Sequence, residues 1–290
     1  MPQGEGVAVI TGSSTGIGFE TSLALARNGF HTYATMRKLE GKSKQITDIA
    51  KNENLPLQAI QLDVDNDKSV IDAINRIVKE KGRIDAVVNN AGYALIGALE
   101  ETPMEEIKAQ FETNFFGAVR VMQAVIPIMR EQKSGKIVNI TSIGGRVAIP
   151  LDPIYHGTKF ALEGLSESIR YELEPFGIKI ILIEPGAVQS NFWKNLKTAV
   201  AASASDPNNN NSAYRQLGNR MSEAFKEIVH NTISASEVAR VILQAVTSDN
   251  PEFRYVVGKD AAMILETRRN MPDRDFQDLI KKQFNLQNIS

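Results

Sequence analysis

Cysteine is absent from the chain, and histidine is scarce. Without cysteine, the protein has no disulfides, no thiolate nucleophile and no Cys-ligated metal site. The three histidines, His31, His156 and His230, stand far apart in the sequence, which argues against a histidine-based metal site. We therefore expect chemistry that needs neither thiols nor a bound metal.

The chain also lacks an excess of one charge and any long apolar run. It has 33 Lys and Arg against 34 Asp and Glu, with no basic block typical of nucleic-acid binding and no acidic tail. No apolar run approaches the roughly 20 residues that span a bilayer. The first residues lack the charged and apolar regions of a signal peptide. These absences predict a cytoplasmic protein with no membrane span and no nucleic-acid partner.

Strand and helix patterns alternate along the 290 residues, and a hydrophobic content of 42% supports a large core. This alternation predicts an α/β fold with a parallel sheet. We expect strands at 6–10, 31–35, 57–62, 84–88, 135–140, 178–183 and 253–257. We expect helices after residue 18 and at 42–52, 67–81, 103–130 (with a break at 114–117), 153–176 and 234–247, and two helical pieces within 261–284.

A glycine-rich turn, Thr-Gly-Ser-Ser-Thr-Gly-Ile-Gly at 11–18, connects the first strand to the first helix. Glycines let a backbone approach a pyrophosphate closely, and a helix N-terminus offers free N–H groups to it. A tight turn without a ligand could have the same composition. The position after a strand and before a helix favours dinucleotide binding.

The second strand ends in Met36, Arg37 and Lys38, without the acid that binds the ribose 2′-hydroxyl in NAD enzymes. Two adjacent cations suit a 2′-phosphate instead. The alternative is that both are ordinary surface charges. We predict a preference for NADP(H) over NAD(H), carried mainly by Arg37.

Small or polar residues follow the later strands as well. They are Asp63 with Val64, the run Asn-Asn-Ala-Gly at 89–92, Ser142, and Pro185 with Gly186. Because open α/β sheets bind ligands at the carboxyl ends of their strands, we expect these residues at the same edge as the glycine turn. Asp63 suits an adenine contact, and residues 89–92 either line a cofactor or brace the sheet.

Two polar positions fall on expected helices. Asn114 interrupts the helix at 103–130, where it is either a buried polar bridge or a proton-relay group. Tyr155 and Lys159 lie four residues apart, one turn from each other on a helix face. A nearby ammonium lowers the pKa of a phenol from about 10 and makes it a usable general acid or base. This pair also occurs by chance in many helices, so its meaning depends on the motifs around it.

Residues 188–232 form the least regular stretch, with an asparagine tract at 208–211 and the large side chains Phe192, Trp193, Tyr214, Met221 and Phe225. Long loops within a compact domain are often lids. We expect a lid that closes on an apolar substrate; the alternative is that these side chains only pack small helices onto the core.

Together these motifs resemble the short-chain dehydrogenase/reductase family in their order and spacing, over about residues 5–258. The segments Ala-Thr-Met-Arg at 34–37 and Lys-Phe-Ala-Leu-Glu-Gly-Leu at 159–165 are most similar to the branch that contains 17β-hydroxysteroid and retinol dehydrogenases.

The resemblance implies a single Rossmann-type domain with a doubly wound, seven-stranded parallel sheet and helices on both faces. It also implies a catalytic tetrad of Asn114, Ser142, Tyr155 and Lys159. In that tetrad Tyr155 exchanges a proton with the substrate oxygen and Ser142 holds that oxygen. Lys159 lowers the pKa of Tyr155 and holds the ribose, and Asn114 positions a water. The implied cofactor contacts are Gly12, Ser14, Thr15, Gly16, Ile17, Gly18, Arg37, Asp63, Val64, Asn90, Ala91, Gly92, Tyr155, Lys159, Pro185, Gly186 and Val188.

We therefore predict an NADP(H)-dependent oxidoreductase acting on an apolar carbonyl or secondary alcohol, as a homodimer or homotetramer. The expected division is a domain at 1–258 and a helical extension at 259–290 that packs on it or on a partner subunit. Two other hypotheses are an NADP-binding redox-sensing regulator, and an epimerase or dehydratase on the same fold.

Overall fold

The computed structural model of the protein describes residues 6–189, 197–198, 212–229 and 232–287. Its centre is a seven-stranded sheet with the order β11-β7-β6-β4-β1-β2-β3, in which every neighbouring pair is parallel. The strands are β1 Val7–Ile10, β2 His31–Met36, β3 Leu57–Gln61, β4 Ala86–Asn89, β6 Gly135–Ile140, β7 Ile178–Pro185 and β11 Arg254–Val257. All seven expected strands are present, with ends shifted by no more than two residues.

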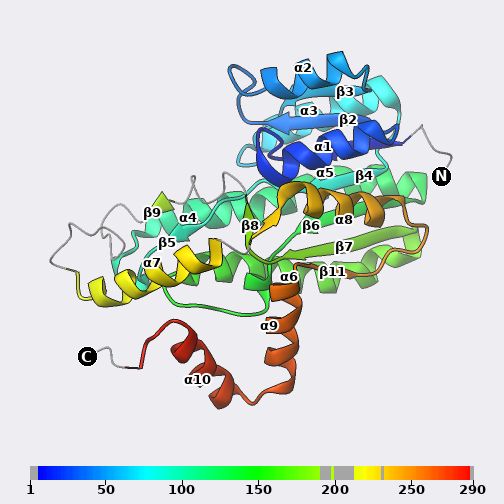
Figure 1. The fold of residues 1–290 in the computed structure, drawn as a ribbon. Helices are drawn as coiled ribbons and strands as arrows, with labels where there is room; N and C mark the ends of the chain where they lie inside the picture. The colour runs from blue at the N-terminus through cyan, green and yellow to red at the C-terminus, as the bar shows by residue number, and fades with distance from the viewer. Residues whose placement is uncertain (1–5, 190–196, 199–211, 230–231, 288–290) are drawn as a thin grey trace.

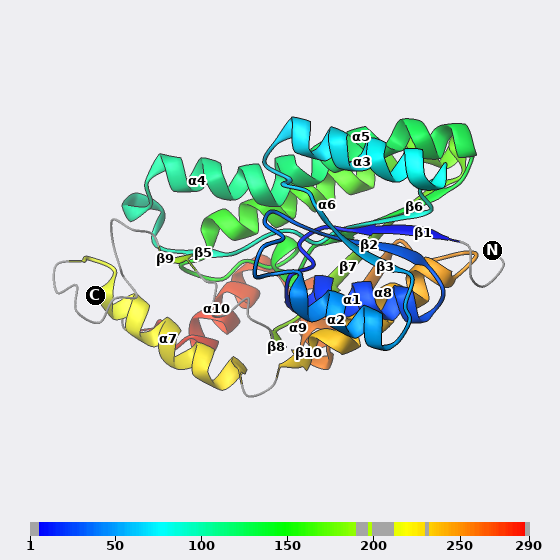
Figure 2. The same ribbon diagram turned by 90° about the horizontal axis from the view of Figure 1, so that it is seen from above.

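Helices cover both faces of the sheet (Figure 1), and the view from above separates the two layers (Figure 2). One layer holds α3, α5 and α6, and the other holds α1, α2 and α8. The helices are α1 Gly16–Arg27, α2 Lys44–Asn52, α3 Asp67–Lys81, α4 Met104–Phe111, α5 Gly117–Gln132, α6 Pro153–Leu173, α7 Arg215–Val229, α8 Ala235–Thr247, α9 Lys259–Asn270 and α10 Asp273–Gln283. The predicted doubly wound α/β fold is confirmed.

The core explains why the strands are apolar throughout. Successive side chains of a strand point to opposite faces, so Val7 and Val9 pack with the α3 and α5 side while Ala8 and Ile10 pack with the α8 side. A strand covered on both faces has no polar face to present to water. The N-terminus of α8 is fixed by the capping box between Ser234 and Glu237.

The helix expected at 103–130 is interrupted where a break was expected, around Asn114. A π-helical turn, Glu112–Phe116, separates α4 from α5. Two short strand pairs were not expected: β5 Leu95–Ile96 pairs with β9 Lys197–Thr198, and β8 Val188–Gln189 pairs with β10 Ile233–Ser234. Within the described residues, none of the helices has both the length and the apolar character that crossing a bilayer requires.

The C-terminal helices form an angle beneath the sheet. α9 leads away from β11, and α10 folds back under α7 (Figure 1). Phe284, Met221, Leu151 and Ala98 are buried together in one cluster, which we call the apolar cluster. This cluster joins α7 and the end of α10 to the loop that precedes α6. The division of the chain at residue 258 stays a prediction.

Candidate active site

The glycine turn after β1 has a geometry that only glycine tolerates. Gly12 and Gly16 have φ angles of 67° and 61°, in the left-handed region that favours glycine. A Cβ on Gly18 would lie 2.6 Å from the carbonyl oxygen of Gly12, so the turn packs too closely for a side chain. Ser14, Thr15 and Ile17 are half-buried around the same turn.

The first turn of α1 suits an anion. Its N-cap residue, Thr15, makes no side-chain capping hydrogen bond, and the turn contains no acidic residue. Unpaired N–H groups and the helix dipole favour a phosphate at such an end. The close backbone and the uncapped helix start therefore fit the pyrophosphate of a dinucleotide.

The run at 89–92 braces this turn. The Asn90 side chain donates to the carbonyl oxygens of Thr11 and Gly12, at 2.8 and 3.1 Å. The backbone N–H groups of Asn90 and Ala91 both donate to the Thr11 hydroxyl, at 2.9 and 3.0 Å. Asn89 donates to Asn139 of β6 at 2.8 Å. Bracing is thus the role that the geometry of Asn89 and Asn90 provides, and a cofactor contact at Asn90, Ala91 or Gly92 stays a prediction.

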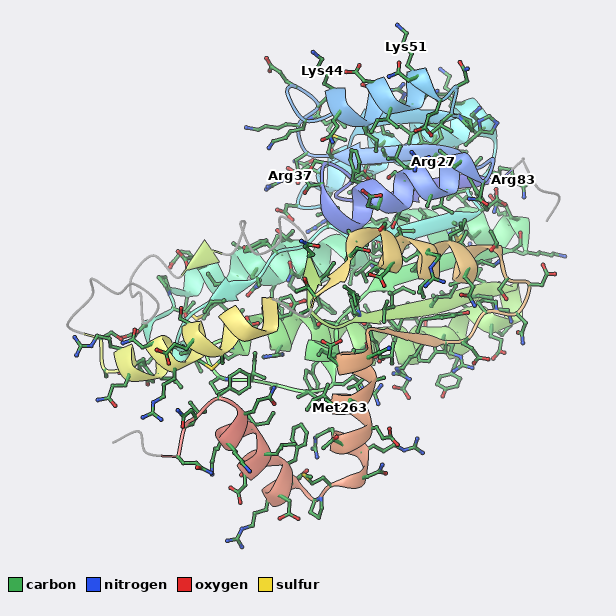
Figure 3. All side chains as sticks on the ribbon, in the orientation of Figure 1. Arg27, Arg37, Lys44, Lys51, Arg83 and Met263 are labelled. Carbon is green, nitrogen blue, oxygen red and sulfur yellow. The ribbon has the colours of Figure 1, made fainter. Side chains whose placement is uncertain are left out.

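At the end of β2, the exposed Arg37 projects from the rim beside α1 (Figure 3). Arg37 also contacts the neighbouring strand β3, because the Gln61 side chain donates to the Arg37 carbonyl oxygen at 3.1 Å. Asp65 lies close enough for the Arg37 charge to lower its pKa, although burial raises that pKa more. Asp63 and Val64 precede Asp65 at this corner, and their contact with the adenosine of a cofactor stays a prediction.

Ser142, Tyr155 and Lys159 come together at the carboxyl ends of β6 and β7. The Ser142 hydroxyl is hydrogen-bonded to the Tyr155 phenol and accepts the Gly144 N–H at 2.9 Å. The Lys159 ammonium lies 5.6 Å from the centroid of the Tyr155 ring and donates to the Ile140 carbonyl oxygen at 2.8 Å. The predicted convergence of these three side chains is present.

Burial is the largest influence on the pKa of both Tyr155 and Lys159. It raises the pKa of the Tyr155 phenol, while the Ser142 hydrogen bond lowers it. Burial also lowers the pKa of Lys159 to about 8, and Glu163 opposes that change. The lowering of the Tyr155 pKa by Lys159 therefore stays a prediction.

Asn114 is buried in the π-helical turn, a feature common at functional sites. Its amide donates to the Tyr93 carbonyl oxygen at 2.8 Å and to the Thr158 hydroxyl at 3.2 Å. Its carbonyl oxygen accepts the Tyr93 N–H at 3.0 Å. Thr158 in turn donates to the Tyr155 carbonyl oxygen at 2.7 Å. Asn114 is thus a buried bridge between the loop after β4 and the N-terminal part of α6, and a relay role stays a prediction.

Two residues beside the site were missed by the sequence analysis. The His156 imidazole accepts the Ile149 N–H at its Nε2 (3.0 Å), and its Nδ1 donates to the Gly144 carbonyl oxygen (2.7 Å). It therefore fixes the loop that follows Ser142. Asp152, at the start of α6, is buried near Tyr155. An aspartate before a proline at a helix start predicts only an N-cap, so no sequence signal pointed to Asp152.

The remaining predicted positions lie at the end of β7. Pro185 and Val188 are buried, and the Gly186 N–H donates to the Val257 carbonyl oxygen at 2.9 Å. Of the expected lid, Phe192, Trp193, the tract 208–211 and the Phe225 side chain lie outside the described residues. Met221 is buried in the apolar cluster, and the Tyr214 hydroxyl donates to Glu100 at 2.7 Å.

Comparisons with known proteins agree with this architecture. The 3-ketodihydrosphingosine reductase of Bacteroides thetaiotaomicron is 34% identical over 273 residues, covering 93% of this chain and 95% of that protein. Human 17-beta-hydroxysteroid dehydrogenase type 1 is 33% identical over 274 residues, covering 92% and 81%. The crystal structure of a short-chain dehydrogenase from Streptomyces avermitilis aligns with a TM-score of 0.80 at 28% identity and covers all of both chains. The short chain dehydrogenase model matches residues 6–201, and the chain belongs to this family of oxidoreductases.

Proposed function

We propose that this protein is an NADP(H)-dependent oxidoreductase that interconverts an apolar carbonyl compound and its secondary alcohol. The observation that carries the proposal is the hydrogen bond between Ser142 and Tyr155, with the Lys159 ammonium 5.6 Å from the same ring. Two hydroxyl groups that meet at the carboxyl edge of the sheet can share one substrate oxygen. The nearby glycine turn fits a dinucleotide.

A bound nicotinamide would supply the hydride to the carbonyl carbon, or take it from the alcohol. Tyr155 donates its proton to the carbonyl oxygen as negative charge develops there, and accepts it back in the reverse direction. The raised pKa keeps Tyr155 protonated at neutral pH, which suits the reducing direction.

Ser142 is held ready to donate to the substrate oxygen. The Gly144 N–H occupies a lone pair of the Ser142 oxygen at 2.9 Å. The single hydroxyl proton of Ser142 is therefore directed away from Gly144, toward Tyr155 or a substrate oxygen. Lys159 adds positive charge beside the phenol and would hold the ribose. Asn114 positions the N-terminal part of α6 through Thr158.

The preference for NADP(H) is supported by charge at the end of β2. Arg37 and Lys38 are both exposed there, and no acid occupies positions 36–39. A guanidinium binds a phosphate through paired hydrogen bonds. Asp65 lies near Arg37, which gives the cation a weak partner that a 2′-phosphate would replace.

An apolar substrate is supported by the apolar cluster, which includes Leu151, four residues before Tyr155. The names of the two relatives describe a ketodihydrosphingosine and a hydroxysteroid as what those proteins act on. We include homo-oligomerisation in the proposal because Phe116, Phe160 and Tyr171 expose large apolar surfaces on the π-helical turn and α6.

The test follows NADPH consumption at 340 nm with a panel of long-chain ketones, steroid ketones and retinal. NADH at the same concentration is the cofactor control. We expect turnover of several apolar carbonyl compounds, with NADPH preferred. Tight NADPH binding without turnover of any panel member would favour a redox-sensing regulator instead.

A further inference from the structure

Asp152 carries a buried carboxyl group, one oxygen of which has no hydrogen-bond partner among the described residues. The residue is 9% exposed, and the oxygen in question is Oδ1. An aspartate at a helix start normally accepts N–H groups of the first turn. Asp152 occupies the N-cap position of α6, yet its side chain makes no such bond. Capping therefore does not explain its burial.

Asp152 lies beside the reacting groups. Its carbonyl oxygen accepts the His156 N–H at 3.1 Å, which places it directly under the first turn of α6. Tyr155 follows three residues later on the same helix start, and a charge on Asp152 raises the pKa of the phenol. A group bound to Asp152 would therefore lie close to the carbonyl that Tyr155 protonates.

The backbone before Asp152 is held in an unusual conformation. Leu151 has a φ of 63°, in the left-handed region that a bulky residue rarely adopts. The Leu151 carbonyl oxygen accepts the Gly97 N–H at 2.8 Å, and its side chain is buried with Met221 and Phe284. Strained backbone conformations of this kind are more frequent at functional sites than elsewhere. This conformation puts an apolar side chain and a carboxyl group on adjacent residues, one in the apolar cluster and one beside Tyr155.

No cation in the described residues compensates Asp152. Burial alone accounts for the rise in its pKa. The neighbouring imidazole of His156 is neutral and has both nitrogens occupied by Gly144 and Ile149. A buried carboxyl group requires a charged or hydrogen-bonding partner. The missing partner would therefore come from a ligand.

We propose that Asp152 binds an amino group on the carbon next to the reacting carbonyl, so that the substrates are α-amino ketones and 1,2-amino alcohols with an apolar chain. This inference rests on the proposed function and names its substrate class. An ammonium supplies both the charge and the donors that Asp152 lacks, and it ionises the carboxyl group on binding. The chain of the substrate then extends toward Leu151 and the apolar cluster. A hydroxyl group would supply a donor without the charge, and would bind more weakly.

The test compares 1-aminododecan-2-ol, dodecane-1,2-diol and dodecan-2-ol as substrates with NADP⁺. We expect wild-type kcat/KM for the amino alcohol to exceed that for dodecan-2-ol by about ten- to hundredfold, the range for a charge-assisted hydrogen bond. This ratio should collapse toward one in Asp152→Asn, which keeps the shape and removes the charge. Asp278→Asn, an exposed carboxyl on α10, is the matched control and should keep the wild-type ratio.

A binding measurement separates this inference from the proposed function. Calorimetric titration of 1-aminododecan-2-ol, with and without NADPH, needs no turnover, and we expect about tenfold weaker binding to Asp152→Asn. Equal binding to both proteins, or an unchanged preference in the variant, would overturn the role of Asp152 even if dodecan-2-ol is oxidised. If none of the alcohols is oxidised but the calorimetric difference is present, the oxidoreductase proposal fails and the amine site remains.

Discussion

The Lys159 ammonium lies 5.6 Å from the centroid of the Tyr155 ring, but its hydrogen bond goes to the Ile140 carbonyl oxygen at the end of β6. The lysine therefore acts on the phenol through its charge, without a direct bond. Burial lowers the pKa of Lys159 to about 8 and raises that of Tyr155. The two groups form a coupled pair in which the lysine releases its proton first.

This coupling predicts the effect of Lys159→Met on alcohol oxidation, which needs a proton acceptor at Tyr155. In the wild type, the pair loses a proton near the Lys159 pKa of about 8. In the variant only the phenol titrates, and burial raises its pKa. The rising limb of the kcat/KM profile should move to higher pH by at least about one unit. The exposed Lys108→Met is the control, and an unmoved limb in Lys159→Met would remove this role.

Tyr155→Phe should abolish proton exchange while leaving the glycine turn and Lys159 in place. Loss of a general acid slows a reaction by about 10²- to 10⁴-fold. We therefore expect turnover to fall by at least about 10²-fold. NADPH binding, followed by fluorescence titration, should stay within about threefold of wild type. Tyr171→Phe is the matched control, because Tyr171 lies on the same helix and is 66% exposed. Near-normal turnover in Tyr155→Phe would reject the proton-donor role.

Arg37→Ala tests the cofactor preference. Removing a guanidinium that binds the 2′-phosphate should raise the KM for NADPH by about tenfold or more, since such bonds are charge-assisted. The KM for NADH, which lacks that phosphate, should change little. Lys38→Ala, at the next exposed position, shows whether a general loss of positive charge suffices. Equal KM changes for the two cofactors would show that Arg37 is an ordinary surface charge with no role in cofactor preference.

The sequence predicted the sheet well because its strands are buried on both faces, as in the apolar run at 178–183. The convergence of Ser142, Tyr155 and Lys159 also follows from topology, since parallel strands end at one edge. The sequence predicts a break around Asn114 but not its π-helical form at Glu112–Phe116, where Asn114 contacts Tyr93 and Thr158 across the fold. The burial of Asp152 is likewise set by tertiary packing, while its local sequence indicates a helix cap.

His156 should make stability depend on pH. Burial lowers the pKa of His156, so the unfolded chain binds a proton more readily than the folded one. Stability from this group is complete above its ordinary pKa of about 6.5 and is lost as the pH falls through that value toward the lowered one. Urea denaturation at pH 8 and pH 5.5 should show this loss in wild type and a smaller one in His156→Asn.

The same variant should be less stable than wild type at pH 8. Asparagine can donate to Gly144 but leaves the Ile149 N–H without its acceptor, which costs about 1–3 kcal/mol. kcat should fall as well, because the loop after Ser142 loosens. His31→Asn, at a half-buried histidine at the start of β2, is the control. A variant as stable as wild type at pH 8 would contradict the bridging role of His156.

Asp152→Asn should raise stability at neutral pH, unlike most substitutions of buried polar groups. Burial raises the pKa of Asp152 well above its ordinary value, so its folded form resists ionisation. The stability of the wild type is therefore lost as the pH rises through and above the ordinary value of about 3.9, whereas asparagine does not titrate. At pH 7.5 the melting temperature should rise by roughly 2–4 °C, and the difference should vanish near pH 4. A gain of stability at the expense of selectivity is typical of a residue kept for ligand binding. A lower melting temperature at pH 7.5, with asparagine in place, would show instead that Asp152 holds α6 in place as a structural cap.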